Sequence, residues 1–312
     1  MYSRNNILRL IYFIFVIIKR ILVTLLLNSN NLIVIIEYEL IPYFPSYLEK
    51  YLHFRKIKYV VDIDDAIFHN YDLNKNYFIR KLLENKIPDV FKNAKAIICG
   101  SHYLFNFATK YNNNVHLLPT VIQNKKYNCT EEKIDNSKFI IGWIGSKSTS
   151  KYVVEILPAL INFLNSKDNV YLHLIGFYKK LQYKMNHPKI QFIEWDESTE
   201  IKELCKFSVG IMPLPDTPWT RGKCGFKLIQ YMALGLPVIC SPVGENKKIV
   251  VNRVNGLFAI SNDNWVQAFE TLYVDSKLRK SMGEKNKAYV SMNYSLASTS
   301  KKYLEIIKTS IG

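Results

Sequence analysis

Cysteine is scarce in this chain, and no cysteine stands at the spacing of a metal site. The five cysteines are scattered and odd in number, and the six histidines are equally dispersed. A structural zinc site is therefore not predicted. Unpaired cysteines of this kind indicate a reduced, cytoplasmic protein rather than a disulfide-rich secreted one. The cysteines are Cys99, Cys129, Cys205, Cys224 and Cys240.

A long uninterrupted hydrophobic run is also missing. The most apolar stretch is RLIYFIFVIIKRILVTLLL, and Lys19 and Arg20 end its first run, Leu10 to Ile18, after nine residues. A membrane-spanning helix needs about 20 apolar residues, so a transmembrane span is not predicted. The run is not followed by a convincing small-residue cleavage site, which argues against a signal peptide. We expect a helix that is buried against a sheet or lies in a membrane interface.

Acidic residues are fewer than basic ones, 26 against 42, and the formal net charge is +16. The excess points to an anionic partner such as phosphate, nucleic acid or an acidic membrane surface. A low-GC genome alone could produce the same Lys-rich composition. Because no RNA-binding signature or recognition helix is present, a nucleic-acid partner is not predicted. The 48% hydrophobic and 22% charged residues are ordinary for a globular protein.

Apolar strand-like and helix-like segments alternate through the 312 residues. This alternation predicts an α/β fold in which helices cover parallel sheets. The length allows roughly two domains of about 150 residues each. Strands are expected within 32–36, 58–64, 94–100, 115–119, 139–145, 170–176, 190–194, 207–214, 237–241 and 256–260.

The polar stretch QNKKYNCTEEKIDNSK marks the expected boundary between the two domains. We expect a first domain over 1–123, a linker over 124–137 and a second domain over 138–294. Residues 295–312 are expected to form a closing helix that could cross back to the first domain.

A basic cluster in PLPDTPWTRGKCGFKLIQYMALGLPVICSPVG is the most informative local feature. It delivers Arg221, Lys223 and Lys227 between a buried strand and a helix that ends at Gly235. Ligands of open α/β sheets bind where strands end and helices begin, and helix N-termini favour phosphate. The cluster therefore predicts an anion site, although a basic surface loop followed by a core helix has the same pattern.

A second strand-to-helix turn occurs in FIIGWIGSKSTSKYVVEIL. Gly142 and Gly145 permit a close approach of the backbone, and Thr149 can cap the helix or bind phosphate. The segment is not a Walker A loop, and two glycines form only a weak dinucleotide fingerprint. Lys151 lies in the first helical turn, where a cation opposes the helix dipole and is better explained by a bound anion.

Carboxylates gather in KYVVDIDDAIF, where the period of two places Asp62 and Asp64 on one face of a strand and Asp65 just beyond it. Such groups can take a proton, hold a hydroxyl or ligate a metal. They can also be solvated residues that end a strand. The Asp-x-Asp pattern of manganese-dependent glycosyltransferases and the phosphatase pattern, which needs Thr at Ala66, are both incomplete.

These blocks together resemble glycosyltransferase family 4, whose members are retaining enzymes of the GT-B architecture. The resemblance rests on GWIGSKSTSKYVVEILPAL, on IMPLPDTPWTRGKCGFKLIQYMALGLPVICSPVGENKKIVVNRVNGLFA and on a late MG…YS segment. VVDIDDAIF, CGSHYLFNFA and LLPTVI extend it through most of the first half. It implies two Rossmann-like parallel-sheet domains that face a cleft. The family's opening strand and Gly-rich loop have no counterpart here, so the first domain is expected to be shortened.

The resemblance also implies roles for individual residues. The family's diphosphate-binding lysine matches Lys151, and the arginine that accompanies it falls on Ser146. The paired glutamates that flank the sugar and the ribose fall on Gly222 and Gln230, whose amide can still hydrogen-bond ribose hydroxyls. The expected donor-binding residues are Gly145, Ser146, Thr149, Lys151, Arg221, Gly222, Lys223, Lys227, Gln230, Gly244, Glu245 and Asn246.

Asp64 falls where the family often carries a histidine near the reacting centre. We therefore expect catalytic roles for Asp64, Asp65, Lys151 and Arg221. The implied enzyme is metal-independent, needs no cofactor and uses a UDP- or GDP-linked sugar. Its expected acceptor is a cell-surface glycan or a lipid-linked molecule at the cytoplasmic membrane face, as in polysaccharide biosynthesis. The alternative is a catalytically impaired protein that binds a glycan or a partner transferase.

Overall fold

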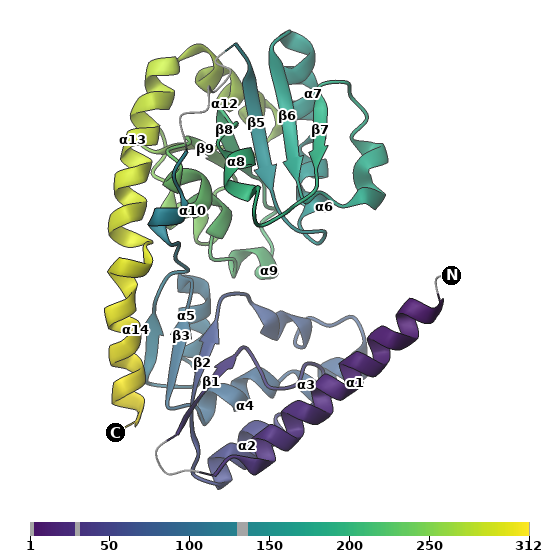
Figure 1. Ribbon diagram of the computed structural model, residues 1–312, viewed down its shortest axis with the longest axis vertical. Coiled ribbons are helices and arrows are strands. Elements are labelled where there is room, and N and C mark those ends of the chain that lie inside the picture. Colours follow the sequence, from purple (N-terminus) through teal and green to yellow (C-terminus); the bar gives the residue numbers. More distant parts are fainter. Residues whose placement is uncertain (1–2, 29–31, 130–136, 312) are drawn as a thin grey trace. The chain divides into compact units, whose positions relative to one another are not determined.

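The computed structural model describes residues 3–28, 32–129 and 137–311 (Figure 1). They form two compact units. The first comprises Met1–Leu118 with Lys302–Gly312, and the second comprises Pro119–Lys301. Residues 130–136 of the predicted linker lie outside the described residues. The domain boundaries expected from the sequence stay a prediction.

The first unit is built on a parallel sheet in the order β1-β2-β3-β4. Its central strands are buried β-branched runs, as is usual for a parallel sheet that helices cover. The strands are β1 (Ile33–Glu37), β2 (Lys58–Ile63), β3 (Ala96–Cys99) and β4 (Val115–Leu117). The helices are α2 (Tyr47–Phe54), α3 (Tyr77–Leu83), α4 (Lys86–Lys92) and α5 (His102–Ala108), with a 3-10 turn η1 (Ile67–Asn70).

The second unit is built on a larger parallel sheet in the order β10-β9-β8-β5-β6-β7. Its strands are β5 (Phe139–Ile144), β6 (Val170–Ile175), β7 (Ile190–Ile193), β8 (Val209–Met212), β9 (Val238–Cys240) and β10 (Gly256–Phe258). The α-helices are α6 (Ser150–Glu155), α7 (Leu157–Ser166), α8 (Glu200–Leu204), α9 (Pro218–Arg221), α10 (Phe226–Ala233), α11 (Asn246–Ile249), α12 (Asn262–Val274) and α13 (Ser276–Asn293). Two 3-10 turns, η2 (Asn124–Lys126) and η3 (Lys179–Lys184), complete it. All ten strands expected from the sequence are therefore present.

Strand β5 shows how the larger sheet forms a core on both faces. Phe139, Ile141 and Trp143 belong to the apolar cluster with α7 and α12, whereas Ile140 and Ile144 belong to the cluster with α10 and α13. This alternation is the period-two pattern of a strand that is covered on both sides. The core therefore holds the ends of the strands rigidly.

Helix α1 (Ser3–Leu26) leaves most of its apolar surface exposed. It contacts α2 through Tyr51, whose hydroxyl donates to the carbonyl of Leu25 at 3.2 Å. Arg20 Nη1 donates to the carbonyl of Leu40 at 2.7 Å. Of the two alternatives expected for this helix, burial against a sheet is wrong, because Ile11 and Phe15 are 58% and 61% exposed. The other alternative, a place in a membrane interface, stays a prediction. Among the described residues, no helix has both the length and the apolar composition that crossing a membrane requires.

Helix α14 (Leu296–Ile311) begins in the second unit and ends in the first. Its start is fixed in the second unit by a bridge between Ile122 and Ser295. Near its end, Ile306 packs into the apolar cluster of the first unit with Val60 and Ile98. The closing helix thus supplies part of the first unit's core.

A disulfide joins Cys129 to Cys205, with the two Cα atoms 5.7 Å apart. The expectation of uniformly reduced cysteines is therefore wrong for this pair. The two residues are 76 positions apart in the chain and become neighbours only when the segment before residue 130 packs on α8. Cys99, Cys224 and Cys240 are buried thiols outside this disulfide, as expected for structural cysteines.

A buried charged cluster holds the loop after β1. The ammonium of Lys86 forms an ion pair with the carboxylate of Glu39, and the two side chains are 1% and 8% exposed. The hydroxyl of Tyr71 donates to the same carboxylate at 2.6 Å. Glu49 Oε1 accepts a hydrogen bond from the backbone N–H of Leu40 at 2.8 Å. These bonds tie the loop to α2 and α4.

Candidate functional site

The turn after β5 brings a glycine against a lysine from another helix. The N–H of Gly145 donates to the carbonyl of Ile175 at 3.1 Å, which aligns the ends of β5 and β6. A Cβ atom at Gly145 would lie 2.5 Å from Lys227 Nζ and would also meet the ring of Trp143. Only glycine therefore fits here, because the indole of Trp143 and the ammonium of Lys227 occupy the space that a side chain would need.

Lys227, in the first turn of α10, is the central cation of this turn. Its Nζ donates to Thr149 Oγ1 at 3.1 Å and lies 4.5 Å from the centroid of the Trp143 ring. Burial, and then the nearby charge of Lys223, lower the pKa of Lys227 to about 7. A bound anion would favour the charged form of this ammonium. Lys227 is thus suited to bind an anion and to take up a proton as it binds.

The hydroxyls of the same turn form a local network. Thr149 Oγ1 accepts from the N–H of Ser146 at 3.1 Å, and Ser150 Oγ donates to the carbonyl of Ser146 at 3.1 Å. Lys151 follows in the first turn of α6, where it is exposed with its Nζ 5.2 Å from the centroid of the Tyr152 ring. The structure thus brings Lys227 rather than Lys151 onto the Thr149 hydroxyl.

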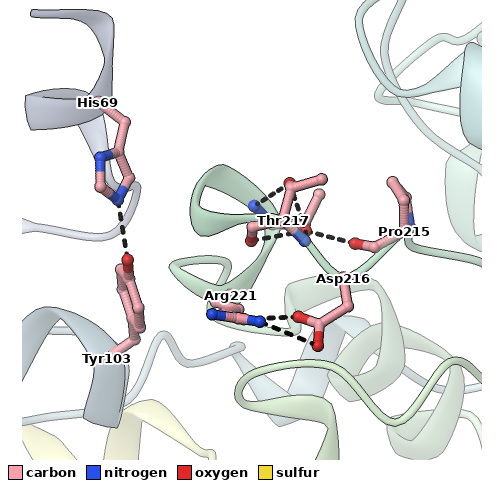
Figure 2. Close-up of polar contacts among 7 residues, drawn as sticks. His69, Tyr103, Pro215, Asp216, Thr217 and Arg221 are labelled. Carbon is pink, nitrogen blue, oxygen red and sulfur yellow. Dashed lines mark hydrogen bonds and ion pairs between the residues drawn. The ribbon is translucent and has the colours of Figure 1, made fainter. Parts of the chain in front are cut away.

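The loop before α10 carries the second predicted cation. Arg221 closes the short helix α9, where its Nε donates to Asp216 Oδ1 at 2.6 Å and its Nη2 to Asp216 Oδ2 at 3.2 Å (Figure 2). This fork lowers the pKa of the Asp216 carboxyl. Thr217 caps α9 through a reciprocal bond with Thr220. The carboxylate of Asp216 thus holds the guanidinium in one orientation.

The loop after β9 packs directly against this segment. Gly244 has φ +51°, and a Cβ atom there would collide with the backbone of Arg221. Asn246 is buried and donates through Nδ2 to the carbonyl of Ser241 at 3.0 Å, while Glu245 is also buried. Two further predicted donor residues are Gly222, buried at the end of α9, and Lys223, whose Nζ lies 5.8 Å from the centroid of the Trp219 ring.

Gln230 belongs to a polar network that the sequence did not reveal. It is 5% exposed, and its Nε2 donates to Tyr127 OH at 3.0 Å and to Glu200 Oε1 at 2.8 Å. Trp195 Nε1 donates to the other oxygen, Glu200 Oε2, at 2.5 Å. Sequence spacing could not reveal these pairs, because Tyr127 and Glu200 are 103 and 30 positions from Gln230.

Of the predicted acidic residues of the first unit, Asp62 lies in β2, and Asp64 and Asp65 follow it. The strand ends at Ile63, so the expectation that Asp62 and Asp64 share one face of it is wrong. Asp64 is exposed and accepts a hydrogen bond from the hydroxyl of Tyr38, and Asp65 is partly buried. Burial, and then the charge of Glu37, raise the pKa of Asp62 to about 6.

A histidine network that sequence reasoning missed lies in the same unit. His69 Nδ1 is 2.9 Å from Asp72 Oδ1. On its other side, His69 Nε2 is 2.8 Å from Tyr103 OH, the contact drawn in Figure 2. Across the described ranges, no three His, Cys, Asp or Glu side chains converge in the way that a metal ion would require.

The sequence of the second unit matches a known protein family. The family model described as glycosyl transferases group 1 matches residues 124–289. No curated protein sequence matches the chain.

Solved structures match at low sequence identity. A glycosyltransferase from Rickettsia africae has a TM-score of 0.70 at 16% identity, with 95% of this chain and 82% of that chain covered. Sucrose-phosphate synthase from Thermosynechococcus elongatus has a TM-score of 0.70 at 14% identity, covering 89% and 73%. Anabaena HepE in complex with UDP has a TM-score of 0.69 at 11% identity, covering 84% and 75%. These likenesses confirm the GT-B class of two parallel-sheet α/β domains.

Proposed function

The chain belongs to the glycosyl transferases group 1 family, and from this premise we propose that it transfers a sugar from a UDP- or GDP-linked donor with retention of anomeric configuration. The finer assignment to glycosyltransferase family 4 is part of this proposal. The observation that carries it is the contact of Lys227 with Thr149 beside Gly145, at the ends of β5 and β6. UDP bound to the similar Anabaena HepE structure supports a nucleotide donor.

The proposed chemistry places positive charge where the leaving diphosphate develops its negative charge. Stabilisation of this kind is usually the largest electrostatic contribution to group transfer. Lys227, Lys223 and Arg221 supply the cations without a metal ion, and Lys151 can join them from the first turn of α6. Gly145 lets the ammonium of Lys227 approach the backbone of the turn.

The acceptor hydroxyl must lose a proton as the new glycosidic bond forms. We assign this proton to Asp64 or to the departing diphosphate. Asp64 is exposed at the end of β2, and its bond from Tyr38 fixes the orientation of the carboxylate. Asp65 follows directly and adds negative charge beside the base. No covalent nucleophile is assigned.

A donor screen tests the proposal. The protein is incubated with UDP- and GDP-sugars, with and without a chelator, and the release of UDP or GDP is measured. We expect release with one nucleotide class that the chelator leaves unchanged. Chelator-sensitive release would overturn the metal-independent mechanism. Failure to bind UDP, GDP or their sugars would overturn the donor assignment itself.

A non-catalytic role is the second candidate. Gly222 and Gln230 stand where the resemblance expects two carboxylates, and this departure favours a protein that binds a glycan or a partner transferase. The same screen separates the two functions. Tight binding of UDP or GDP by isothermal titration, without release or transfer from any donor, would favour the second.

We further propose that α1 docks the protein on an anionic membrane, where a lipid-linked acceptor of cell-surface glycan synthesis would lie. One stripe of the helix follows a spacing of three and four residues, and its side chains are 42% to 61% exposed. The sequence of α1 contains four basic and no acidic residues, which favours anionic lipid over a second, equally basic copy of the chain. The stripe consists of Leu8, Ile11, Phe15, Ile18, Leu22 and Leu25.

Vesicle sedimentation tests this surface. We expect the protein to sediment with phosphatidylglycerol vesicles, not with phosphatidylcholine vesicles, and to be released by salt. The double variant Phe15→Glu/Ile18→Glu should stay in solution, whereas Val274→Glu, at a still more exposed apolar site on α12, should sediment as the wild type does. Self-association of the wild type without vesicle binding would contradict the proposal.

A further inference from the structure

We propose that Trp195 and Glu200 form the nucleoside half of the donor site, in which Glu200 accepts a hydrogen bond from a ribose hydroxyl and the indole of Trp195 stacks on the base. The inference rests on the proposed function, because it assigns the part of the donor that Lys227 does not bind. It gives a role to Trp195, in the loop after β7, and to Glu200, the first residue of α8, neither of which sequence spacing singles out.

The loop after β7 lies beside the glycine turn. Gly176, which follows β6, has φ +70°, and its N–H donates to the carbonyl of Ile193 at 2.9 Å. A Cβ atom on Gly176 would meet the carbonyl oxygen of Gly145 on one side and the Cβ of Trp195 at 3.4 Å on the other. Gly145, Gly176 and Trp195 therefore form a continuous row across the ends of three neighbouring strands.

Helix α10 connects the two halves of this row. Lys227 and Gln230 are three residues apart, so they lie on the same face of the helix with a rise of about 4.5 Å between them. Lys227 reaches Thr149 on the turn after β5, and Gln230 reaches Glu200 beyond β7. A ligand along this face would meet a cation at one end and a carboxylate at the other.

The opposite charges of Lys227 and Glu200 determine which end of a bound nucleotide lies at which residue. Phosphates are repelled by the Glu200 carboxylate and attracted by Lys227, so the diphosphate belongs at the Lys227 end. An ionised carboxylate is an acceptor with about four lone-pair sites, and Glu200 uses one oxygen for Gln230 and the other for Trp195. Tyr127 is a third hydrogen-bond partner of this carboxylate, so acceptor capacity remains for a ribose hydroxyl.

Trp195 provides the surface for the base. Its side chain is 53% exposed although its ring nitrogen is anchored on Glu200, so the orientation of the indole is fixed while its surface stays open. Every nucleobase has a π-face, and stacking on an aromatic side chain tolerates any base. The indole therefore contributes affinity for a nucleoside, and the carboxylate selects ribose over deoxyribose.

Titration of matched ligands tests the inference. Wild type and Glu200→Gln are titrated with UDP and GDP and with their 2′-deoxy and 3′-deoxy forms. Removal of a hydroxyl that bonds to a carboxylate should weaken wild-type binding about 10- to 100-fold. In Glu200→Gln the same removal should cost less than about 3-fold, because a neutral acceptor makes a weaker bond. Equal losses in both proteins would overturn the assignment of Glu200.

Trp195 variants supply a second measurement that does not depend on Glu200→Gln folding. Trp195→Ala should weaken UDP or GDP binding about 10-fold and leave inorganic pyrophosphate binding unchanged, since pyrophosphate has no base to stack. Trp195→Phe keeps a stacking ring and should recover most of the loss. Equal weakening of pyrophosphate would overturn the stacking role. If the wild type binds nucleotide but loses the same affinity as Glu200→Gln when a ribose hydroxyl is removed, this inference alone is overturned. If the wild type binds no nucleotide, the proposed function is overturned as well.

Discussion

In the second unit, the loops that follow the strands bring cations and glycines together, whereas in the first unit the corresponding loops carry carboxylates and phenols. Lys227 and Arg221 represent the first kind, and Asp64 and Tyr38 the second. Both sheets are parallel, so the difference lies in loop chemistry and not in architecture. One set of loops suits a diphosphate, and the other suits a hydroxyl that must lose its proton.

The backbones of the two sets of loops differ in the same way. The positive φ angles in the turns after β6 and β9 fall on Gly176 and Gly244, where they carry little strain. In the loop after β1 they fall on Tyr38 and Tyr43, at 64° and 56°. A left-handed tyrosine costs free energy and persists only when its surroundings hold it. The buried Lys86–Glu39 pair fixes this loop and therefore the phenol that contacts Asp64.

Loss of the proposed base should have the largest effect. Asp64→Asn keeps the shape of the side chain but cannot take a proton, so kcat should fall about 10²- to 10⁴-fold. Donor affinity should stay within about 2-fold, since the donor binds the other unit. Steady-state transfer rates and titration with UDP or GDP measure the two quantities. Glu37→Gln, an exposed carboxylate at the end of β1, is the control. If Asp64→Asn is fully active, Asp64 is not the base, and the departing diphosphate takes the proton of the acceptor hydroxyl.

Disruption of the buried pair should come next. Lys86→Met leaves the Glu39 carboxylate buried without its charged partner and should lower the free energy of unfolding of the first unit by about 3–5 kcal/mol. Adding Glu39→Gln removes the buried charge and should restore part of the loss. Urea unfolding, followed by a signal specific to the first unit, measures both variants. If the double variant is as unstable as the sum of the single ones, the pair is not a coupled unit.

Removal of the central cation of the second unit should have a smaller effect. Lys227→Ala loses one charge-assisted contact, so kcat/KM for the donor should fall about 10- to 100-fold. Lys179→Ala, which removes a lysine from an exposed ion pair with Glu194, should be close to wild type. An unchanged Lys227→Ala together with a 10- to 100-fold loss in Lys151→Ala would instead assign the diphosphate to the exposed lysine of α6.

Apolar patterning could predict the fold because the central strands of both sheets are buried apolar runs separated by helices. The cations near Thr149 could also be expected, since strand ends and helix starts are read from adjacent residues. The contacts of Glu200 and Cys205 could not be predicted from the sequence. Glu200 meets Gln230, and Cys205 meets Cys129, only after the chain folds. The sequence also does not show that the apolar surface of α1 is exposed, since an apolar helix has the same sequence pattern whether or not a partner covers it.

The smallest effect is a pH dependence confined to the cationic site. The pKa of Lys227 is lowered to about 7, mainly by burial, and a bound diphosphate should raise it. Binding therefore takes up a proton above pH 7, so nucleotide affinity should fall as pH rises from 7 to 9, by at most about tenfold per pH unit. Below pH 7 the lysine is already charged, and its contribution should not change.

Isothermal titration with UDP and GDP across this range, in buffers of different ionisation enthalpy, measures both the affinity and the proton uptake. Lys227→Arg is the matched control, because a guanidinium stays charged throughout and should flatten the profile between pH 7 and 9. Phosphate ionisation of the nucleotide is the same with both proteins and cancels in the comparison. If nucleotide affinity falls equally steeply with pH in Lys227→Arg, the titrating group is a residue other than Lys227. The lowered pKa of Lys227 would then have no part in donor binding.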